Sequence, residues 1–261
     1  MEEPLLQYDQ VEICYHGRPV VQDICFYLLP GEILGIVGES GSGKSTLLKG
    51  GMGLLGPGGA VTKGTIRYKN KNLPDLPQKE LRKLCGKELG MVFQDSGSAL
   101  CPIRTIGEQI YECMAAHGPY TKAEAMDRGA ELMGKLGLPD PRQILSRYPF
   151  ELSGGMVQRA GICMAMLHHP SVLLADEPTS ALDAFIQRQV MDEMLLMREL
   201  YGTSIILVTH HIGVVRAMAD RVVVLKDGHI VESGCTGEVF EHPASSYTKL
   251  LMASVPHLRR K

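Results

Sequence analysis

The chain has 261 residues, enough for one large domain or two small ones with a real hydrophobic core. Apolar residues make up 44% and charged residues 21%, which is ordinary for a soluble globular protein. Lysine and arginine number 27 against 29 aspartates and glutamates, and the net charge of -2 lacks the basic excess usual in nucleic-acid-binding proteins. We therefore expect no nucleic-acid partner.

The cysteines and the apolar runs argue against several further classes of protein. The seven cysteines are scattered and form no CxxC pair, so a disulfide framework and a zinc site are both unexpected. The acidic N-terminal stretch predicts no secretory signal, and the longest apolar runs are far shorter than the roughly 20 residues that span a bilayer. If the protein works at a membrane, we expect another chain to hold it there.

The first third of the chain predicts two kinds of strand. Residues 5–30 and 61–73 have the pattern of short antiparallel strands, separated by a Gly/Pro loop at residues 53–59. Between them, the run 33–37 is apolar throughout, as in a buried parallel strand, and residues 44–50 have a helical pattern.

A phosphate-binding motif lies between that buried strand and that helix. Glycines let the backbone curl so that several N–H groups point at one anion, and the following helix adds the positive end of its dipole. The lysine adds a full charge for the β- and γ-phosphates, and the last serine can bind Mg²⁺. The motif matches GxxxxGK[ST] without a gap, as Gly38-Glu39-Ser40-Gly41-Ser42-Gly43-Lys44-Ser45.

The middle of the chain predicts helices. In residues 96–152, Thr121 and Glu124 have the spacing of a capping box, which satisfies the backbone at a helix start. We expect Met126, Ala130, Met133 and Leu136 to share the apolar face of that helix. This region therefore predicts a helical insertion into a sheet domain.

The last third returns to strand and helix alternation. Residues 172–175, 204–208 and 222–225 predict buried strands, and residues 184–201 and 212–219 predict helices. The alternation predicts a mostly parallel sheet covered by helices, which is the α/β class.

The strand at 172–175 ends in two acids. Strands of such sheets present their carboxyl ends to a ligand, so Asp176 is predicted to orient a bound Mg²⁺. Glu177, one residue further on, can polarise the water that attacks a γ-phosphate. An acidic turn alone would be weak evidence, but beside a phosphate loop it predicts nucleotide hydrolysis.

A third motif carries a family resemblance. The stretch Leu152-Ser153-Gly154-Gly155-Met156, continued by Gln158-Arg159, resembles the LSGGQ signature of ABC ATPases, with methionine in its last place. Ser153 can cap a helix there, and the two glycines leave space for a phosphate. The order of phosphate loop, signature and acidic strand makes the resemblance specific, and it covers essentially the whole chain.

The resemblance implies a fold with three parts. These are a P-loop NTPase (RecA-like) parallel sheet core, an antiparallel β subdomain and an inserted α-helical subdomain. The core with its β subdomain would comprise residues 1–95 and 160–261, and the helical subdomain residues 96–159.

The resemblance also implies a set of site residues. ATP and Mg²⁺ are the implied cofactors, with Mg²⁺ held through Ser45, Gln94 and Asp176. An aromatic residue, Tyr15, would stack on the adenine ring, although it could instead be a tyrosine of the hydrophobic core. A glutamine after a strand, Gln94, would report the nucleotide state to the helical subdomain. The implied residues are Tyr15 (adenine), Gln94 (Q-loop), Ser180-Ala181-Leu182-Asp183 (D-loop), His210 (switch histidine) and Thr46 with the phosphate loop.

Within the family, the chain is most similar to ATPases of peptide, dipeptide and nickel importers. The stretches on which this similarity rests include residues 148–156, Gly213-Val214-Val215, and residues 242–251 with Tyr247-Thr248. Three residues depart from that group: Ser96 stands in place of proline, Cys101 in place of Asn or Asp, and His211 in place of aspartate. The first two lie in the segment that, by resemblance, faces the permease. The short sequence after Pro256 is closer to the nickel and metallophore members.

The resemblance finally implies partners and a place. Two ATPase subunits, identical or paralogous, would pack head to tail on membrane permease subunits at the cytoplasmic face of the cell membrane. An extracytoplasmic substrate-binding protein would take part indirectly. The alternative is an ABC ATPase of a soluble enzyme assembly such as a carbon–phosphorus lyase system. A role in translation or DNA repair is disfavoured by the single cassette and the lack of basic excess.

Overall fold

The computed structural model describes residues 3–180 and 182–253. By its internal contacts the chain forms two compact units, one with residues up to Leu81 and from Ser204 onward, the other Arg82–Thr203. The described residues contain no helix with the length and apolar character needed to cross a membrane.

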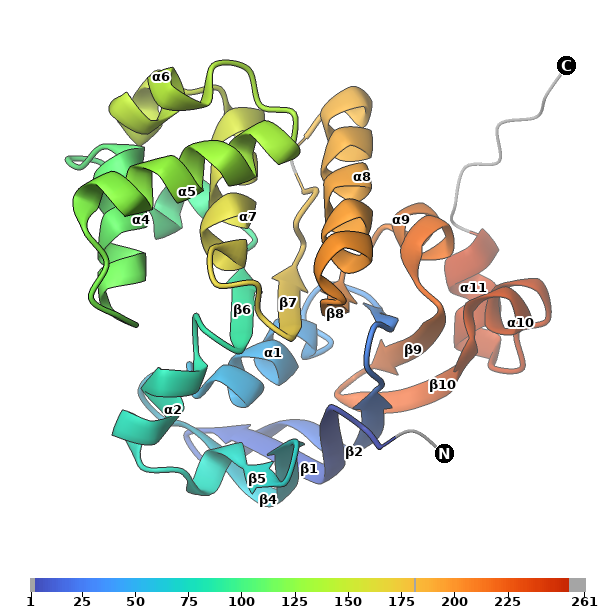
Figure 1. The fold of residues 1–261 in the computed structure, drawn as a ribbon. Coiled ribbons are helices and arrows are strands. Elements are labelled where there is room, and N and C mark those ends of the chain that lie inside the picture. The colour runs from blue at the N-terminus through green and yellow to red at the C-terminus, as the bar shows by residue number, and fades with distance from the viewer. Residues whose placement is uncertain (1–2, 181, 254–261) are drawn as a thin grey trace, which may run out of the picture. The chain divides into compact units, whose positions relative to one another are not determined.

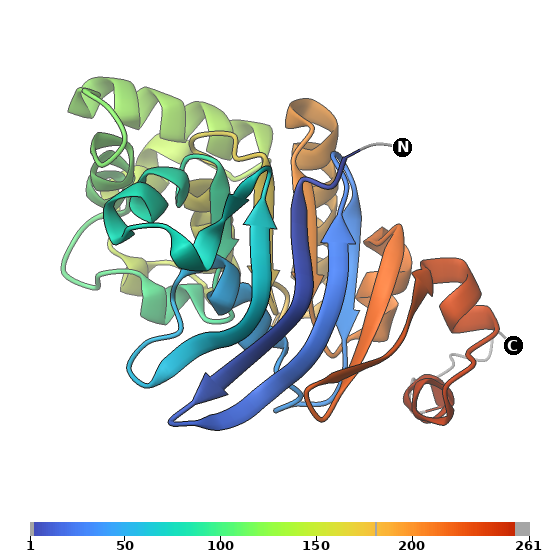
Figure 2. The same ribbon diagram turned by 90° about the horizontal axis from the view of Figure 1, so that it is seen from below.

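The first unit contains an antiparallel sheet of four strands in the order β2-β1-β4-β5 (Figure 2). Its strands are β1 (Leu6–Tyr15), β2 (Arg18–Leu28), β4 (Gly59–Tyr68) and β5 (Lys71–Asn72). His16 and Gly17 join β1 to β2 with positive φ at both positions, as a tight hairpin turn requires. This sheet confirms the antiparallel strands predicted at residues 5–30 and 61–73.

The same unit contains parallel strands. β3 (Ile33–Val37) lies between β8 (Ser204–Val208) and β9 (Arg221–Lys226), parallel to both, and β10 (His229–Cys235) adds to β9 antiparallel. All five residues of β3 are buried, which explains their continuous apolar pattern. The helices of this unit are α1 (Lys44–Met52), α9 (Ile212–Met218), α10 (Thr236–Glu241) and α11 (Ser246–Ala253) (Figure 1).

Helix α1 is fixed against the antiparallel sheet. The hydroxyl of the fully buried Tyr8 in β1 donates to the carbonyl of Leu47 in α1 at 2.9 Å. Gly50 allows the close approach, because a Cβ there would lie 2.8 Å from Ile13 of β1. The sheet therefore sets the position of the helix that follows the phosphate loop.

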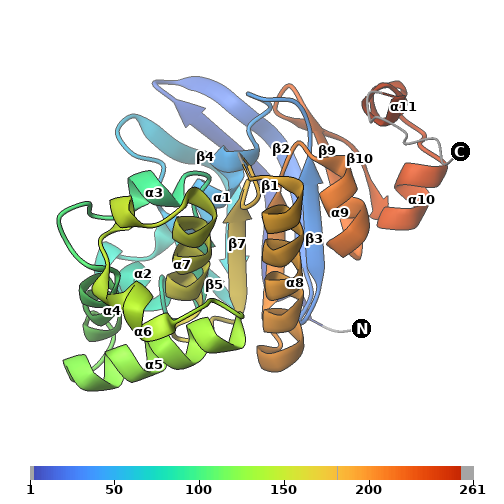
Figure 3. The same cartoon turned by 90° about the horizontal axis from the view of Figure 1, so that it is seen from above.

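The second unit holds a short parallel pair, β6 (Leu89–Val92) and β7 (Val172–Asp176) (Figure 1), and its helices lie around β7 in the view of Figure 3. Together with the first unit it confirms the α/β class, with parallel strands, an antiparallel sheet and a helical region. The other helices of this unit are α3 (Ser96–Ala99), α4 (Ile106–Ala115), α5 (Lys122–Lys135), α6 (Pro141–Ser146), η2 (Pro149–Glu151), α7 (Gly154–Met166) and α8 (Ala184–Tyr201). The short helix η1 (Leu73–Asp75) belongs to the first unit, and α2 (Gln78–Leu84) spans the boundary between the units at Leu81. The boundary predicted at residues 96–159 is a finer division than these two units and stays a prediction.

Helix α5 confirms the predicted cap and the burial of Met133 and Leu136, but the first half of the predicted face is shifted. Thr121 and Glu124 form the capping box. The buried residues of the helix are Ala125, Gly129, Leu132 and Met133, whereas Met126 and Ala130 are half-buried. The face is shifted because Ile110 of α4 packs where Gly129 has no side chain, 3.0 Å from its ideal Cβ position. A count of apolar side chains does not register a contact made by a glycine.

Candidate active site

The phosphate loop begins where β3 ends, at Gly38. A Cβ at this position would lie 2.1 Å from the carbonyl oxygen of Leu225 in β9, so only glycine allows the strand to turn here. Gly43, at the other end of the loop, has φ of 99° and would place a Cβ 2.3 Å from Val21 of β2. The loop is therefore enclosed by the Leu225 backbone at one end and by the Val21 side chain at the other, and this close approach requires both glycines.

Lys44 is folded back over this loop. Its ammonium donates to the carbonyls of Gly38 at 2.8 Å and Glu39 at 2.7 Å, and the side chain is buried. The Ser42 N–H also donates to the Glu39 carbonyl, at 3.2 Å. Because these carbonyls point at the ammonium, N–H groups of the residues that follow Glu39 can converge on an anion.

The start of α1 is suited to an anion as well. The N-cap residue Gly43 has no side chain with which to cap the helix, and the first turn carries no acidic residue. Helix starts leave backbone N–H groups without helical partners, and the dipole makes this end positive. Ser45 and Thr46 lie in this first turn, half-buried, where the prediction requires them.

Two other predicted residues lie on the first unit. Tyr15 ends β1, half-buried, with its ring against Gly59, where a Cβ would lie 2.8 Å from the ring. His210 is exposed shortly after β8, and its ring centre is 4.5 Å from that of His211. The adenine and switch roles of these residues stay predictions.

The predicted acids end β7 on the second unit. Asp176 is 4% and Glu177 7% exposed, so both carboxyl groups are buried at the strand tip. Glu177 has φ of 47°, a left-handed conformation that costs a non-glycine residue about 1–2 kcal/mol. Such strain persists where the surroundings enforce it, and it clusters at active sites.

The structure brings the backbone of Gln94 beside this strained turn. The parallel strands β6 and β7 pair Val92 with Ala175, so both segments leave the sheet at the same edge. The Ser180 hydroxyl lies 3.0 Å from the Glu177 carbonyl and 3.4 Å from the Gln94 carbonyl, and can donate to either. The Q-loop residue and the predicted general base are thus linked within one unit.

The segment after Gln94 is attached to the signature helix. The backbone N–H of the buried Ser96 donates to Gln158 Oε1 in α7 at 3.4 Å. A Cβ on Gly161 would lie 2.6 Å from Ser96 Oγ, so α7 also packs closely on this residue. A proline at position 96 could not donate this bond.

The signature residues lie at the start of α7. Ser153 is the N-cap residue and its hydroxyl accepts from the Met156 N–H at 3.4 Å, as predicted. Gly154 faces open space, whereas a Cβ on Gly155 would lie 2.8 Å from Ile186 of α8. The absent side chain of Gly154 thus leaves open space for a ligand, whereas that of Gly155 allows α7 to pack closely on α8.

Asp183 has a structural contact in addition to its predicted place in the D-loop. Its carboxylate caps α8 by accepting from the N–H groups of Phe185 and Ile186, both at 3.0 Å. Ala181 of the same predicted loop lies outside the described residues. The predicted residues therefore form two groups, one on each unit.

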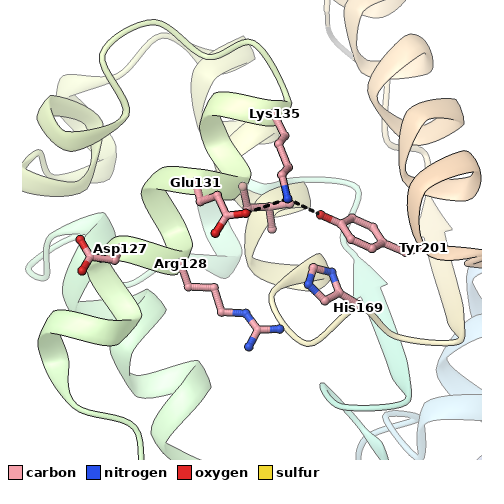
Figure 4. A pocket seen from close by; sticks show the side chains of 7 residues that line it. Asp127, Arg128, Glu131, Lys135, His169 and Tyr201 are labelled. Atoms are coloured by element: carbon pink, nitrogen blue, oxygen red, sulfur yellow. Dashed lines mark hydrogen bonds and ion pairs between the residues drawn. The ribbon is translucent and has the colours of Figure 1, made fainter.

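A separate pocket of about 270 Å³ on the second unit contains none of the predicted site residues (Figure 4). Its charges are largely paired: Lys135 binds Glu131 at 2.7 Å and the Tyr201 hydroxyl at 3.4 Å, and Asp127 binds Arg142 at 2.8 Å. We assign it no part in the site. Its lining residues are Asp127, Arg128, Glu131, Leu132, Lys135, His169 and Tyr201.

Comparison with known proteins decides the family. A family model described as ABC transporter matches residues 21–180, more than half of the chain. The chain belongs to the ABC transporter family.

Relatives of this ABC ATPase extend over nearly its whole length. A dipeptide transport ATP-binding protein of Lactococcus lactis is 40% identical over 98% of this chain and 74% of its own. An oligopeptide transport ATP-binding protein of Bacillus subtilis is 43% identical over 91% of this chain and 67% of its own. The dimeric structure of MJ0796, a bacterial ABC transporter cassette, aligns with a TM-score of 0.79 and 29% identity, covering 88% of this chain and 98% of that one.

The motifs did not identify every residue that contacts the site. The Glu39 N–H donates to the hydroxyl of Tyr247 at 3.1 Å, across 208 positions of sequence. Tyr247 belongs to a stretch that carries the family resemblance, but no local pattern assigned it a partner. The bridging hydroxyl of Ser180 was likewise hidden, because it depends on the left-handed turn at Glu177.

The two loop glycines Gly38 and Gly41 give a matched prediction. Gly38→Ala should weaken ATP binding at least tenfold, because its Cβ would meet a backbone oxygen that cannot move aside. Gly41→Ala should cost only the backbone strain at φ of 83°, roughly 1 kcal/mol or fivefold, since nothing lies within 4 Å. Calorimetric titration with ATP compares them, and equal affinities would contradict the enclosed loop.

Proposed function

We propose that this ABC ATPase binds and hydrolyses Mg-ATP to energise a membrane importer of peptides, nickel or metal-chelate complexes. The observation that carries the proposal is the phosphate loop, in which the Lys44 ammonium binds the carbonyls of Gly38 and Glu39. The loop leads into helix α1, whose N-cap residue is a glycine without a capping side chain. The names of the relatives support peptides most directly, since they are dipeptide and oligopeptide transport proteins.

The first unit supplies the grip on ATP. Backbone N–H groups of the loop and of the first turn of α1 donate to the phosphate oxygens, and Lys44 adds its charge to the β- and γ-phosphates. Tyr15 stacks on the adenine ring. Ser45 of this unit offers a hydroxyl oxygen to Mg²⁺, and Gln94 and Asp176 of the second unit offer an amide and a carboxylate oxygen, the ligand class that Mg²⁺ prefers. The ion, when bound, would neutralise charge on the phosphates.

The second unit supplies the chemistry of hydrolysis. The Glu177 carboxylate accepts the proton of the attacking water, and its strained backbone holds the carboxylate at the strand tip. Gln94 orients the water and transmits the nucleotide state to the helices that follow. His210, from the first unit, contacts the γ-phosphate.

A second ATPase subunit completes each site. Ser153, Gly154 and Gly155 at the start of α7 would meet the γ-phosphate held by the partner's loop, and Asp183 would lie at the crossing. The dimeric ABC cassette MJ0796 among the related structures supports such an assembly. A monomer should then bind ATP and hydrolyse it poorly.

The permease is proposed to contact the segment after the Q-loop, at the cytoplasmic face of the membrane. Gln109 of α4 holds this segment, accepting from the Cys101 N–H at 2.8 Å and donating to the carbonyls of Cys101 at 3.0 Å and Arg104 at 3.1 Å. Ile103, within the segment, is 82% exposed. A rigid loop presenting an apolar side chain suits a protein contact. An extracytoplasmic substrate-binding protein would deliver the cargo to that permease.

Two substitutions separate binding from hydrolysis. Glu177→Gln should keep the ATP affinity but lower turnover by roughly 10²–10⁴-fold, and should trap a nucleotide-bound dimer, because the water loses its proton acceptor. Lys44→Ala should weaken the affinity itself. ATPase assays and calorimetry on the same preparations measure both; normal turnover of Glu177→Gln would refute the assigned role.

The permease contact is tested with Ile103→Asp. An aspartate at the centre of an apolar contact should weaken permease binding by at least roughly 30-fold. The tagged chain is purified from detergent-solubilised membranes, and Leu200→Asp, a change at the 52% exposed Leu200 in α8, is the control.

Permease subunits should co-purify with the wild type and the control and be lost with Ile103→Asp. Retention by Ile103→Asp would contradict this docking segment. Recovery of soluble enzyme subunits in place of permeases would instead support the carbon–phosphorus lyase type of assembly.

A further inference from the structure

The C-terminal helix of the first unit contacts the phosphate loop. Tyr247, in the first turn of α11, is 7% exposed, and its hydroxyl accepts the Glu39 N–H at 3.1 Å. The Lys226 ammonium lies 5.1 Å from the centre of its ring. The ring is therefore packed, and its oxygen reaches the second residue of the motif.

The bond acts on one particular peptide unit. The Glu39 N–H and the Gly38 carbonyl belong to the same planar peptide, and in a trans peptide they point in opposite directions. The structure has no cis peptide bond among its described residues. Tyr247 holds the N–H on one side of this plane, and the Lys44 ammonium binds the carbonyl on the other, at 2.8 Å. Fixing the N–H therefore fixes the direction of the carbonyl that holds the lysine.

Tyr247 is itself held by the sheet beside the loop. The carboxylate of Glu232 in β10 accepts from the N–H groups of Ala244 at 2.7 Å and Ser245 at 3.1 Å. The Tyr247 N–H then donates to Ser245 Oγ at 3.2 Å. Since β10 pairs with β9, which contacts Gly38 through Leu225, the loop and the tyrosine share one frame.

We propose that Tyr247 is a positioning residue for nucleotide binding, which orients the Gly38–Glu39 peptide and, through it, the Lys44 ammonium. The inference rests on the ATP site proposed above. It adds a residue from the far end of the chain that acts through Lys44 without touching the nucleotide. Burial raises the pKa of the Tyr247 hydroxyl, which therefore stays protonated and neutral at physiological pH.

A double-mutant cycle tests this role. Tyr247→Phe keeps the ring and removes the hydroxyl, and should weaken ATP binding roughly 3- to 30-fold by leaving the Glu39 N–H without the acceptor that orients it. If the hydroxyl acts through the lysine, Tyr247→Phe should change the affinity little in a Lys44→Ala background. Calorimetric titrations with Mg-ATP, carried into the millimolar range for Lys44→Ala, give the four affinities.

Tyr27→Phe is the matched control, because Tyr27 of β2 also lies under a cation, with Arg221 4.2 Å from its ring centre. This variant should bind ATP with the affinity of the wild type. Unchanged affinity of Tyr247→Phe would overturn the inference, as would an equal loss in both backgrounds, which would mean general damage to the loop. A wild type that does not bind ATP would refute the proposed function itself.

Discussion

The shape of the phosphate loop depends on the contact between the Lys44 ammonium and the carbonyls of Gly38 and Glu39. A chain that binds a polyanion through its backbone must turn its N–H groups inward and its carbonyls away. The lysine makes this possible, because it gives those carbonyls a buried charged partner. Gly38 completes the arrangement by letting the strand turn against the Leu225 carbonyl, where no side chain fits.

The two units contribute different chemistry, and their local energetics differ accordingly. The loop on the first unit is supported on several sides, by Val21, Leu225 and Tyr247, as a binding element must be. On the second unit, Glu177 has a left-handed backbone, and the chain leaves the sheet there at the same edge as the segment that contains Gln94. The left-handed backbone of Glu177 costs stability, so its presence at the end of a parallel strand fits a residue that is placed for the reaction. Binding and hydrolysis can therefore be disrupted separately.

The sequence predicted what depends on local pattern and missed what depends on folding. The apolar runs located β3, β7, β8 and β9, and the caps at Thr121 and Ser153 follow from hydroxyl groups that bond within three residues. Gly129 was missed because a contact allowed by an absent side chain has no hydrophobic signal. The contact of Tyr247 with Glu39 joins residues 208 positions apart, and no period or motif encodes such a pairing.

A Mg-ATP titration followed by amide NMR of the ¹⁵N-labelled chain tests the phosphate loop directly. A backbone amide that begins to donate to a phosphate oxygen shifts strongly downfield. If the loop and the start of α1 bind the phosphates, the amides of residues 41–46 should show large, saturable downfield shifts with one affinity for all of them. If ATP bound while these amides stayed unmoved, or if the shifts gathered in another part of the chain, the phosphate grip described here would be wrong.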